Sequence, residues 1–154
     1  MLKVESDEQL SALLRARGQR VTSQRLLIHR MLRRQDRHMT AEDVREAVID
    51  DLPGTSAPTV YATLDLLADL GLVRCLHVGS GPALYDSRPD EHHHTVCRDC
   101  GRVDDLDGSA DLSALVAAAR GADFDPGQID VILSGLCRGC SSLRRAAAGA
   151  PQAA

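Results

Sequence analysis

The chain of 154 residues is poor in aromatic side chains and has no long apolar segment. Aromatic residues make up 2% of it and tryptophan is absent, so its cores have to be built from Leu, Val, Ile and Ala. No apolar run approaches the roughly 20 residues that cross a bilayer, which predicts no membrane partner. The N-terminus MLKVESDEQL lacks the apolar stretch of a secretory signal. We therefore expect a cytoplasmic protein whose thiols stay reduced.

Charge is distributed unevenly along the chain. Residues 1–88 hold 12 basic and 12 acidic side chains, whereas residues 89–154 hold 6 and 10, so the net charge of −4 arises in the C-terminal part. Eight arginines between Ser11 and Arg37 are accompanied by a single acidic residue, Asp36. Such a concentration is typical of a phosphate-binding surface, and equally of solvated helical faces. Charge alone leaves both interpretations open.

Capping signals and apolar periodicity predict four helices in the N-terminal half. Capping-box spacings open two of them, at Ser6 and Thr40, and the N-caps of the two others are Thr22 and Ser56. Two β-rich runs around residues 79–81, GSG, then predict a hairpin. This order is typical of a winged helix-turn-helix, in which the helix after the turn enters the DNA major groove. A plain helical bundle with the same amphipathicity is the alternative.

In a winged helix, the helix expected from Ser56 to Leu70 would be the recognition helix. Its outward N-terminal positions, Ser56 and Thr59, carry small side chains, and Tyr61 is the only large one. Small side chains favour contacts with thymine methyl groups and the reading of DNA shape over bidentate base contacts. We therefore expect Ser56, Thr59 and Tyr61 to contact DNA.

Four of the five cysteines form two Cys-x-x-Cys pairs, Cys97 with Cys100 and Cys137 with Cys140. Together they offer four thiolates for a closed tetrahedral Zn²⁺ site, which has no open position and so favours a structural role over catalysis. Two disulfides are the alternative, which a reducing compartment disfavours. The fifth cysteine, Cys75, lies in an apolar strand, where a buried thiol is expected.

Three consecutive histidines, His92 to His94, precede the first cysteine pair. On a strand, His92 and His94 point to one face and His93 to the other, so two imidazoles can reach one ion. An exposed polar turn is the alternative. The carboxylates close enough in sequence to complete a site are Asp86, Glu91, Asp104 and Asp105.

The rest of the C-terminal part is predicted as a small sheet with one helix. Strands are expected over GRVDDL and QIDVILSGLC, with a helix over Asp111–Arg120 between them. A sheet covered by one helix leaves apolar surface exposed, which favours a homodimer. The Ala-rich segment 142–154 is predicted to be a disordered tail.

In combination, the segments RVTSQR, HMTAEDV, TVYATLDLLADLGLV, HHHTVCRDCG and CRGC resemble the ferric uptake regulator (Fur) family. The resemblance implies an α+β chain with an N-terminal winged helix-turn-helix at 1–84 and a hinge at 85–90. A small C-terminal α/β dimerisation domain, with its zinc, would follow at 91–141. It also implies a metal-dependent repressor that binds double-stranded operator DNA as a homodimer and is not an enzyme.

The resemblance also assigns the ligands of a regulatory metal. HMTAEDV places His38 in the DNA-binding part, LYDS places Asp86 at the hinge, and the remaining ligands are His92, His94 and Asp105. Three imidazoles and two carboxylates suit Fe²⁺ or Mn²⁺ better than a zinc sensor, which in this family usually recruits a thiolate. The bound ion would draw the two domains together and fix the spacing of the winged helices.

Asp86 and Asp105 resemble the ligands of the peroxide-sensing branch (PerR) of the family. There, bound Fe²⁺ reacts with peroxide, a ligand histidine is oxidised and the repressor leaves DNA; the candidates here are His38 and His92. An iron- or manganese-uptake regulator is the alternative within the family. Arg20 occupies the RVT position, which implies contact with the DNA backbone or minor groove.

The sequence also departs from the family pattern. A further histidine near the last strand often completes a third metal site, but DPGQIDVILSG has none, which leaves Glu91 and His93 without a predicted role. Ala62 replaces a polar residue of many relatives, which puts fine base specificity in doubt. Outside the family, a non-haem iron enzyme or a zinc-ribbon module that binds protein would also explain the metal donors.

Overall fold

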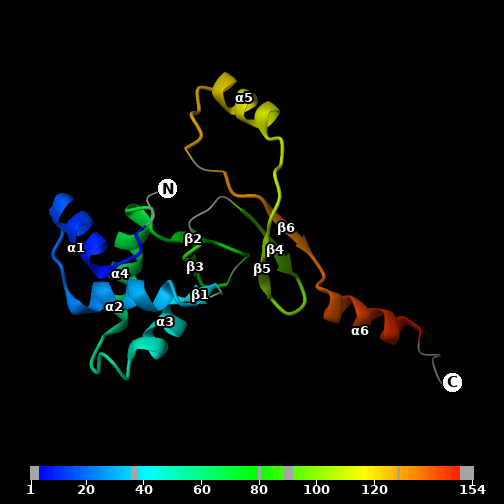
Figure 1. Ribbon diagram of the computed structural model, residues 1–154. Helices are drawn as coiled ribbons and strands as arrows, with labels where there is room; N and C mark the ends of the chain where they lie inside the picture. The colour runs from blue at the N-terminus through cyan, green and yellow to red at the C-terminus, as the bar shows by residue number, and fades with distance from the viewer. Residues whose placement is uncertain (1–3, 36–37, 80, 89–91, 128, 150–154) are drawn as a thin grey trace. The chain divides into compact units, whose positions relative to one another are not determined.

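The computed structural model describes residues 4–35, 38–79, 81–88, 92–127 and 129–149. The chain divides into two units, Met1–Asp90 and Glu91–Ala154. Each unit combines α-helices with a three-stranded sheet of its own (Figure 1). Within the described ranges, no helix is both long enough and apolar enough to cross a bilayer.

All four helices of the N-terminal unit begin directly after the N-cap residues that the sequence predicts, and three of those residues cap the helix with their side chains. Ser6 and Thr40 each form a complete capping box, and the Thr22 hydroxyl accepts the N–H of Arg25. Ser56 is also an N-cap by position, but its hydroxyl lies 3.0 Å from that of Thr59 and caps no backbone group. The helices are α1 (Asp7–Ala16), α2 (Ser23–Leu32), α3 (Ala41–Val48) and α4 (Ala57–Asp69).

The sheet of the N-terminal unit contains the predicted hairpin. Its strands β1 (Met39–Thr40), β2 (Arg74–Leu76) and β3 (Leu84–Asp86) are antiparallel in the order β1-β3-β2. Gly79 lies in the hairpin loop with φ +59°, a conformation that glycine adopts without strain. The order of helices and hairpin is that of the winged helix-turn-helix, as predicted.

Aliphatic side chains from all four helices and the hairpin form one core in this unit. Tyr85 is its only buried aromatic residue among those described, consistent with the low aromatic content. Cys75 packs half-buried at the edge of this core, where burial raises the pKa of its thiol. The most completely buried members are Leu10, Leu14, Ile28, Met39, Val44, Val60, Leu64 and Leu67.

The C-terminal unit is built on a mixed sheet. Strand β4 (His93–Cys97) lies at its centre, antiparallel to β5 (Val103–Leu106) and parallel to β6 (Ile132–Gly135). Helix α5 (Ser113–Gly121) connects β5 to β6 and begins two residues later than predicted. In Figure 1, long connections hold α5 away from the sheet.

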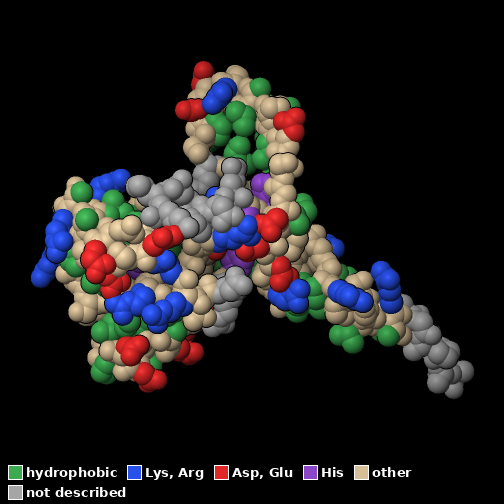
Figure 2. Space-filling model, viewed as in Figure 1, with side chains coloured by type: hydrophobic (Ala, Val, Ile, Leu, Met, Phe, Trp, Pro, Cys, Tyr) green, Lys and Arg blue, Asp and Glu red, His purple; other side chains and the backbone are tan. Residues whose placement is uncertain are grey.

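Large apolar side chains of the C-terminal unit remain exposed. None of the nine described residues of α5 is buried, and Leu115 is 61% exposed. Phe124 and Leu133 are likewise more than half exposed. Figure 2 shows hydrophobic side chains at the surface of the segment that carries α5. An apolar surface of this kind is typical of a protein interface.

Helix α6 (Arg138–Gly149) occupies most of the segment that we predicted as a disordered tail from residue 142. That prediction was wrong up to Gly149. Composition favoured disorder because the residues are small or charged, but Ala, Leu and Arg are also strong helix formers. The helix starts inside the second cysteine pair, where local contacts already fix its first turn and reduce the cost of nucleation. Residues 150–154 lie outside the described part.

Candidate metal centres

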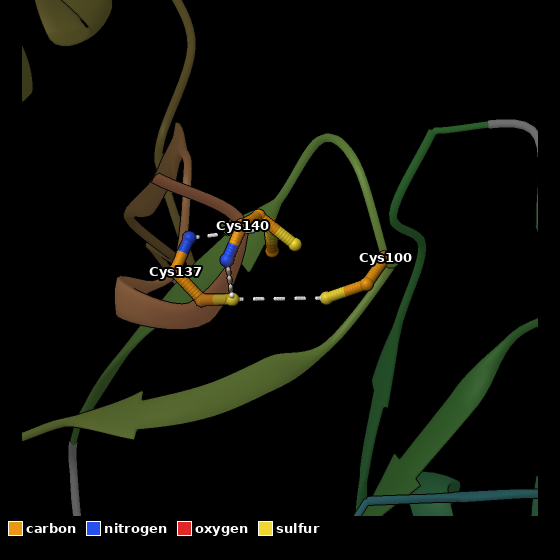
Figure 3. A group of neighbouring side chains, drawn as sticks. Cys100, Cys137 and Cys140 are labelled. Carbon is orange, nitrogen blue, oxygen red and sulfur yellow. Dashed lines mark hydrogen bonds between the residues drawn. The ribbon is translucent and has the colours of Figure 1, made fainter. Parts of the chain in front are cut away.

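The four cysteines of the two Cys-x-x-Cys pairs come together within the C-terminal unit. Their sulfur atoms all lie within 4.8 Å of one another, and those of Cys100 and Cys137 are 3.9 Å apart (Figure 3). With Zn–S bonds of about 2.3 Å, tetrahedral geometry places sulfur atoms about 3.8 Å apart. Every cysteine is free in this structure. The cluster therefore fits a structural Zn²⁺.

Backbone N–H groups of the two turns point at the sulfur atoms. Cys137 N donates to the sulfur of Cys97 at 3.3 Å, and Cys140 N donates to that of Cys137 at 3.5 Å. Backbone N–H groups that donate to its sulfur, that of Cys137 first and that of Cys100 next, lower the pKa of Cys97 to about 6. Hydrogen bonds from its thiol to the neighbouring cysteines, that with Cys137 first, raise the pKa of Cys140 to about 12. The local geometry thus favours thiolate at Cys97, which is the form that binds metal.

Two predicted regulatory ligands lie side by side in the N-terminal unit. His38 directly precedes β1 and Asp86 ends β3, and the pairing of Met39 with Tyr85 brings them to the same end of the sheet. A donor atom of His38 lies within 4.8 Å of a carboxylate oxygen of Asp86. Asp86 is buried, and its carboxylate accepts the backbone N–H of Arg88 at 2.8 Å. That hydrogen bond fixes the orientation of the carboxylate.

The other three predicted ligands lie on one face of the C-terminal sheet. His92 and His94 are buried, and their Nε2 atoms are 3.1 Å apart. Two nitrogens that bind one ion at right angles, each at about 2.1 Å, stand about 3 Å apart. Asp105 pairs with His94 in the ladder, and its carboxylate lies 3.7 Å from Nε2 of His92. The two imidazoles are thus close enough to bind one ion, whereas Asp105 stays a predicted ligand.

The strand register separates these ligands from the other nearby candidates. Asp104 pairs with Thr95 and therefore points to the opposite face, where it forms an ion pair with Arg102 at 2.7 Å. His93 alternates with His94 and also faces away from the ligand pair. Glu91 lies outside the described residues.

The predicted DNA-contacting residues lie at accessible positions of the N-terminal unit. Arg20 and Ser56 are exposed, Thr59 is half-buried, and Tyr61 is 49% exposed. Figure 2 shows Lys and Arg side chains on the surface of this unit.

Among the described residues, three of the eight clustered arginines have structural partners, and one of them, Arg25, donates to the backbone carbonyl of Arg20. Arg30 binds the carboxylate of Asp7, and Arg33 donates to the backbone carbonyl of Glu5, so both tie α2 to the start of the chain. Arg37 lies outside the described residues. Arg30 and Arg33 thus have structural roles, and phosphate binding by the other arginines remains a prediction.

Sequence reasoning missed one ion pair beside the cysteine cluster. Arg144 of α6 binds the carboxylate of Asp99, which lies inside the first Cys-x-x-Cys pair. The position of Asp99 between two ligands was a usable signal. Its partner could not be identified, because residue 144 was predicted to be disordered.

Comparison with known proteins agrees with this arrangement. The model of the ferric uptake regulator family matches residues 16–128. The peroxide-responsive repressor PerR of Staphylococcus aureus is 31% identical over 133 residues, which cover 86% of this chain and 90% of that protein. The structure of the ferric uptake regulator from Pseudomonas aeruginosa with manganese is 28% identical, with a TM-score of 0.67, and covers 83% of this chain and 97% of that one. A zinc uptake regulator complexed with zinc and DNA is 25% identical, with a TM-score of 0.65 and coverage of 90% and 94%.

These matches establish the class of the protein. Members of the family are metal-dependent transcription regulators that work in the cytoplasm, bind operator DNA as dimers and are not enzymes. A non-haem iron enzyme and a protein-binding zinc ribbon are therefore excluded. Since the family model covers most of the chain and a relative above 30% identity covers 86% of it, the chain belongs to the ferric uptake regulator family.

Proposed function

We propose that this chain is a repressor that binds operator DNA when it holds Fe²⁺ or Mn²⁺ and releases DNA in response to peroxide. The observation that carries the proposal is the pair of buried imidazoles, His92 and His94, with nitrogen atoms 3.1 Å apart beside Asp105. Nitrogen and oxygen donors of this kind suit Fe²⁺ and Mn²⁺. The 31% identity to a peroxide-responsive repressor supports the choice of signal.

In this proposal one regulatory ion takes donors from both units. His38 and Asp86 belong to the N-terminal unit, whereas His92, His94 and Asp105 belong to the other. The linker between Asp86 and His92 is short, so side chains on both sides of it would restrain the two units when they hold the same ion. Metal binding would then favour the arrangement of the two units that fits DNA over the one that does not. The size of this shift is set by the difference in metal affinity between the two arrangements.

Peroxide sensitivity is expected only with iron bound. Fe²⁺ would supply the electron transfer that activates peroxide. The imidazole of His38 or His92 would gain one oxygen atom, with release of water, and would become a poorer ligand. Protein loaded with Fe²⁺ should therefore leave DNA on addition of hydrogen peroxide, and the peptide that carries His38 or His92 should gain the mass of one oxygen.

Protein loaded with Mn²⁺ is the matched control and should keep both its DNA and its mass. Unmodified histidines in the iron-loaded protein, with DNA still bound after peroxide, would contradict peroxide sensing. That result would favour a sensor of iron or manganese level. The likeness to the manganese-bound regulator from P. aeruginosa supports this second candidate function.

We assign the structural Zn²⁺ to Cys97, Cys100, Cys137 and Cys140, and we infer that the C-terminal unit forms a homodimer. Covering the exposed side chains of Leu115, Phe124 and Leu133 would contribute roughly 25 cal/mol for each Å² of apolar surface removed from water. A second copy of the chain is the partner that members of this family use.

We assign DNA contacts to Arg20, Ser56, Thr59 and Tyr61. Arg20→Ala is expected to weaken binding to all DNA sequences, because one phosphate contact is lost. The slope of log affinity against log salt concentration should fall in magnitude by about one unit. Tyr61→Ala should instead reduce the preference among sequences, because an aromatic ring on the recognition helix reaches base edges. Binding of each variant to two related duplexes over a range of salt concentrations measures both effects.

Arg120→Ala is the matched control for these variants, because Arg120 lies on α5 of the other unit and is exposed. It should leave affinity and salt dependence unchanged. If Arg20→Ala and Tyr61→Ala bind both duplexes like the control, the proposed DNA-binding face is in the wrong place.

A further inference from the structure

A bidentate ion pair joins the first cysteine-bearing turn of the C-terminal unit to helix α6, which begins within the second cysteine pair. The guanidinium of Arg144 donates to both carboxylate oxygens of Asp99, with an Nε–Oδ2 distance of 2.8 Å. The two residues are 45 positions apart in the chain. Bidentate pairing of this kind has a defined geometry as well as charge attraction.

Asp99 and Arg144 each lie close in sequence to one of the two cysteine pairs. Asp99 lies between Cys97 and Cys100, in the turn that connects β4 to β5. Arg144 follows Cys140 by four residues on α6, so the two side chains lie on the same face of the helix. In Figure 3, Cys100 approaches from the β4–β5 turn, while Cys137 and Cys140 come from the start of α6. The pair therefore spans the same two elements that a metal in the cluster would join.

The guanidinium also lies in the electrostatic field of the thiols. Its hydrogen bond with Asp99 is the main cause that raises the pKa of Arg144, and the negative charges of Cys140 and Cys97 raise it further. Four thiolates around one Zn²⁺ leave a net charge of −2, which a nearby cation stabilises.

We propose that Arg144 and Asp99 form a brace that positions the two Cys-x-x-Cys turns and slows the loss of zinc from the cluster. Arg144 is a positioning residue, because it acts through Asp99 and through its charge and does not bind the metal. The role rests on the proposal that the cysteine cluster holds zinc. It extends that proposal to two residues that are not ligands.

The alternative to this proposal is that Arg144 and Asp99 form an exposed ion pair that has no effect on zinc binding. Arg144 has a side chain 65% exposed, and most isolated ion pairs at a surface contribute little. This pair differs because it closes a loop of 45 residues across the metal cluster. A pocket of about 350 Å³ is lined in part by Cys97 and Cys137, and Cys100 is exposed, so a small chelator can approach the cluster. Loss of the brace should therefore be measurable as faster metal transfer.

The test is zinc transfer from the full-length protein to a chromogenic chelator, followed for both rate and equilibrium. Arg144→Gln is expected to transfer zinc about 10-fold faster and to bind it about 10-fold more weakly, the lower end of the usual effect of groups that support metal ligands. Arg145→Gln is the matched control, because it removes the same charge one position further along the exposed surface of α6. It should behave like the wild type.

Two further variants separate positioning from a general loss of structure. Arg144→Lys keeps the charge but not the bidentate geometry, so its transfer rate should lie between those of the wild type and Arg144→Gln. Asp99→Asn removes the ion pair but keeps the guanidinium charge beside the cluster, so it should transfer zinc faster than the wild type and no faster than Arg144→Gln. The double variant should be no worse than Arg144→Gln, because the ion pair is already lost in either single variant. Circular dichroism of the zinc-loaded proteins should show equal helix content.

The proposal is overturned if Arg144→Gln and Arg145→Gln transfer zinc at the same rate, or if the effects of Asp99→Asn and Arg144→Gln simply add. The zinc content of the purified wild type separates this failure from failure of the zinc assignment. A wild type without zinc overturns both. A zinc-loaded wild type with unaffected variants overturns only the brace.

Discussion

Replacement of Cys137 by Ser is expected to remove the zinc and the dimer together. Structural Zn²⁺ in small domains contributes roughly 10 kcal/mol or more of apparent binding free energy, which is comparable with the whole unfolding free energy of a typical domain. The C-terminal unit depends on this contribution because it buries few large side chains; Val96 and Cys97 are its only buried hydrophobic residues among those described. Without the metal, the start of α6 is held to the β4–β5 turn by weaker contacts, such as the ion pair of Arg144 with Asp99.

Metal analysis and analytical ultracentrifugation of the purified variant measure the two losses. Cys75→Ser is the control, since Cys75 belongs to the other unit and lies outside the cluster. It should keep one zinc per chain and remain dimeric. A Cys137→Ser protein with full zinc content and normal dimerisation would show that the cluster is not the structural site.

Replacement of His38 by Ala should weaken the dependence of DNA binding on the regulatory metal without unfolding either unit. His38 is the ligand nearest to the DNA-binding helices in sequence, so it is the residue best placed to couple the ion to the N-terminal unit. A usual coupling free energy of about 1–3 kcal/mol between two binding sites corresponds to a change in affinity of about 5- to 150-fold. We therefore expect His38→Ala to need that much more Mn²⁺ for half-maximal DNA binding, while its zinc content and dimerisation stay normal.

A titration of DNA binding with Mn²⁺, followed by fluorescence anisotropy, measures this shift. His77→Ala is the matched control, because His77 is an exposed histidine of the same unit that lies outside the predicted site. If His38→Ala and His77→Ala require the same Mn²⁺ concentration, His38 is not a regulatory ligand.

Local signals in the sequence were sufficient for most of the fold. The capping boxes at Ser6 and Thr40 predicted helix starts correctly, since the interactions that define them lie within four residues. The alternation of His92 and His94 likewise predicted a shared face, and the register of Asp105 with His94 agrees with it.

Long-range contacts are what the sequence could not provide. Helix α6 was missed because its first turn depends on the cysteine cluster and its Arg144 on Asp99, 45 residues away. One local prediction also failed, since the side chain of Ser56 was expected to cap α4 but contacts the hydroxyl of Thr59, three residues away. The predicted boundaries at residues 84 and 90 remain predictions, as does the joint ligation of one ion by the two units.

The most direct test of the account is DNA binding with and without the regulatory metal. A duplex is first selected from a random pool by the zinc-loaded protein in the presence of Mn²⁺, and its affinity is then measured in Mn²⁺ and in metal-depleted buffer. The account predicts binding at least 5-fold tighter with Mn²⁺, from the lower end of the usual coupling range. Equal affinity in both buffers, with zinc still bound, would contradict the claim that metal binding controls this repressor.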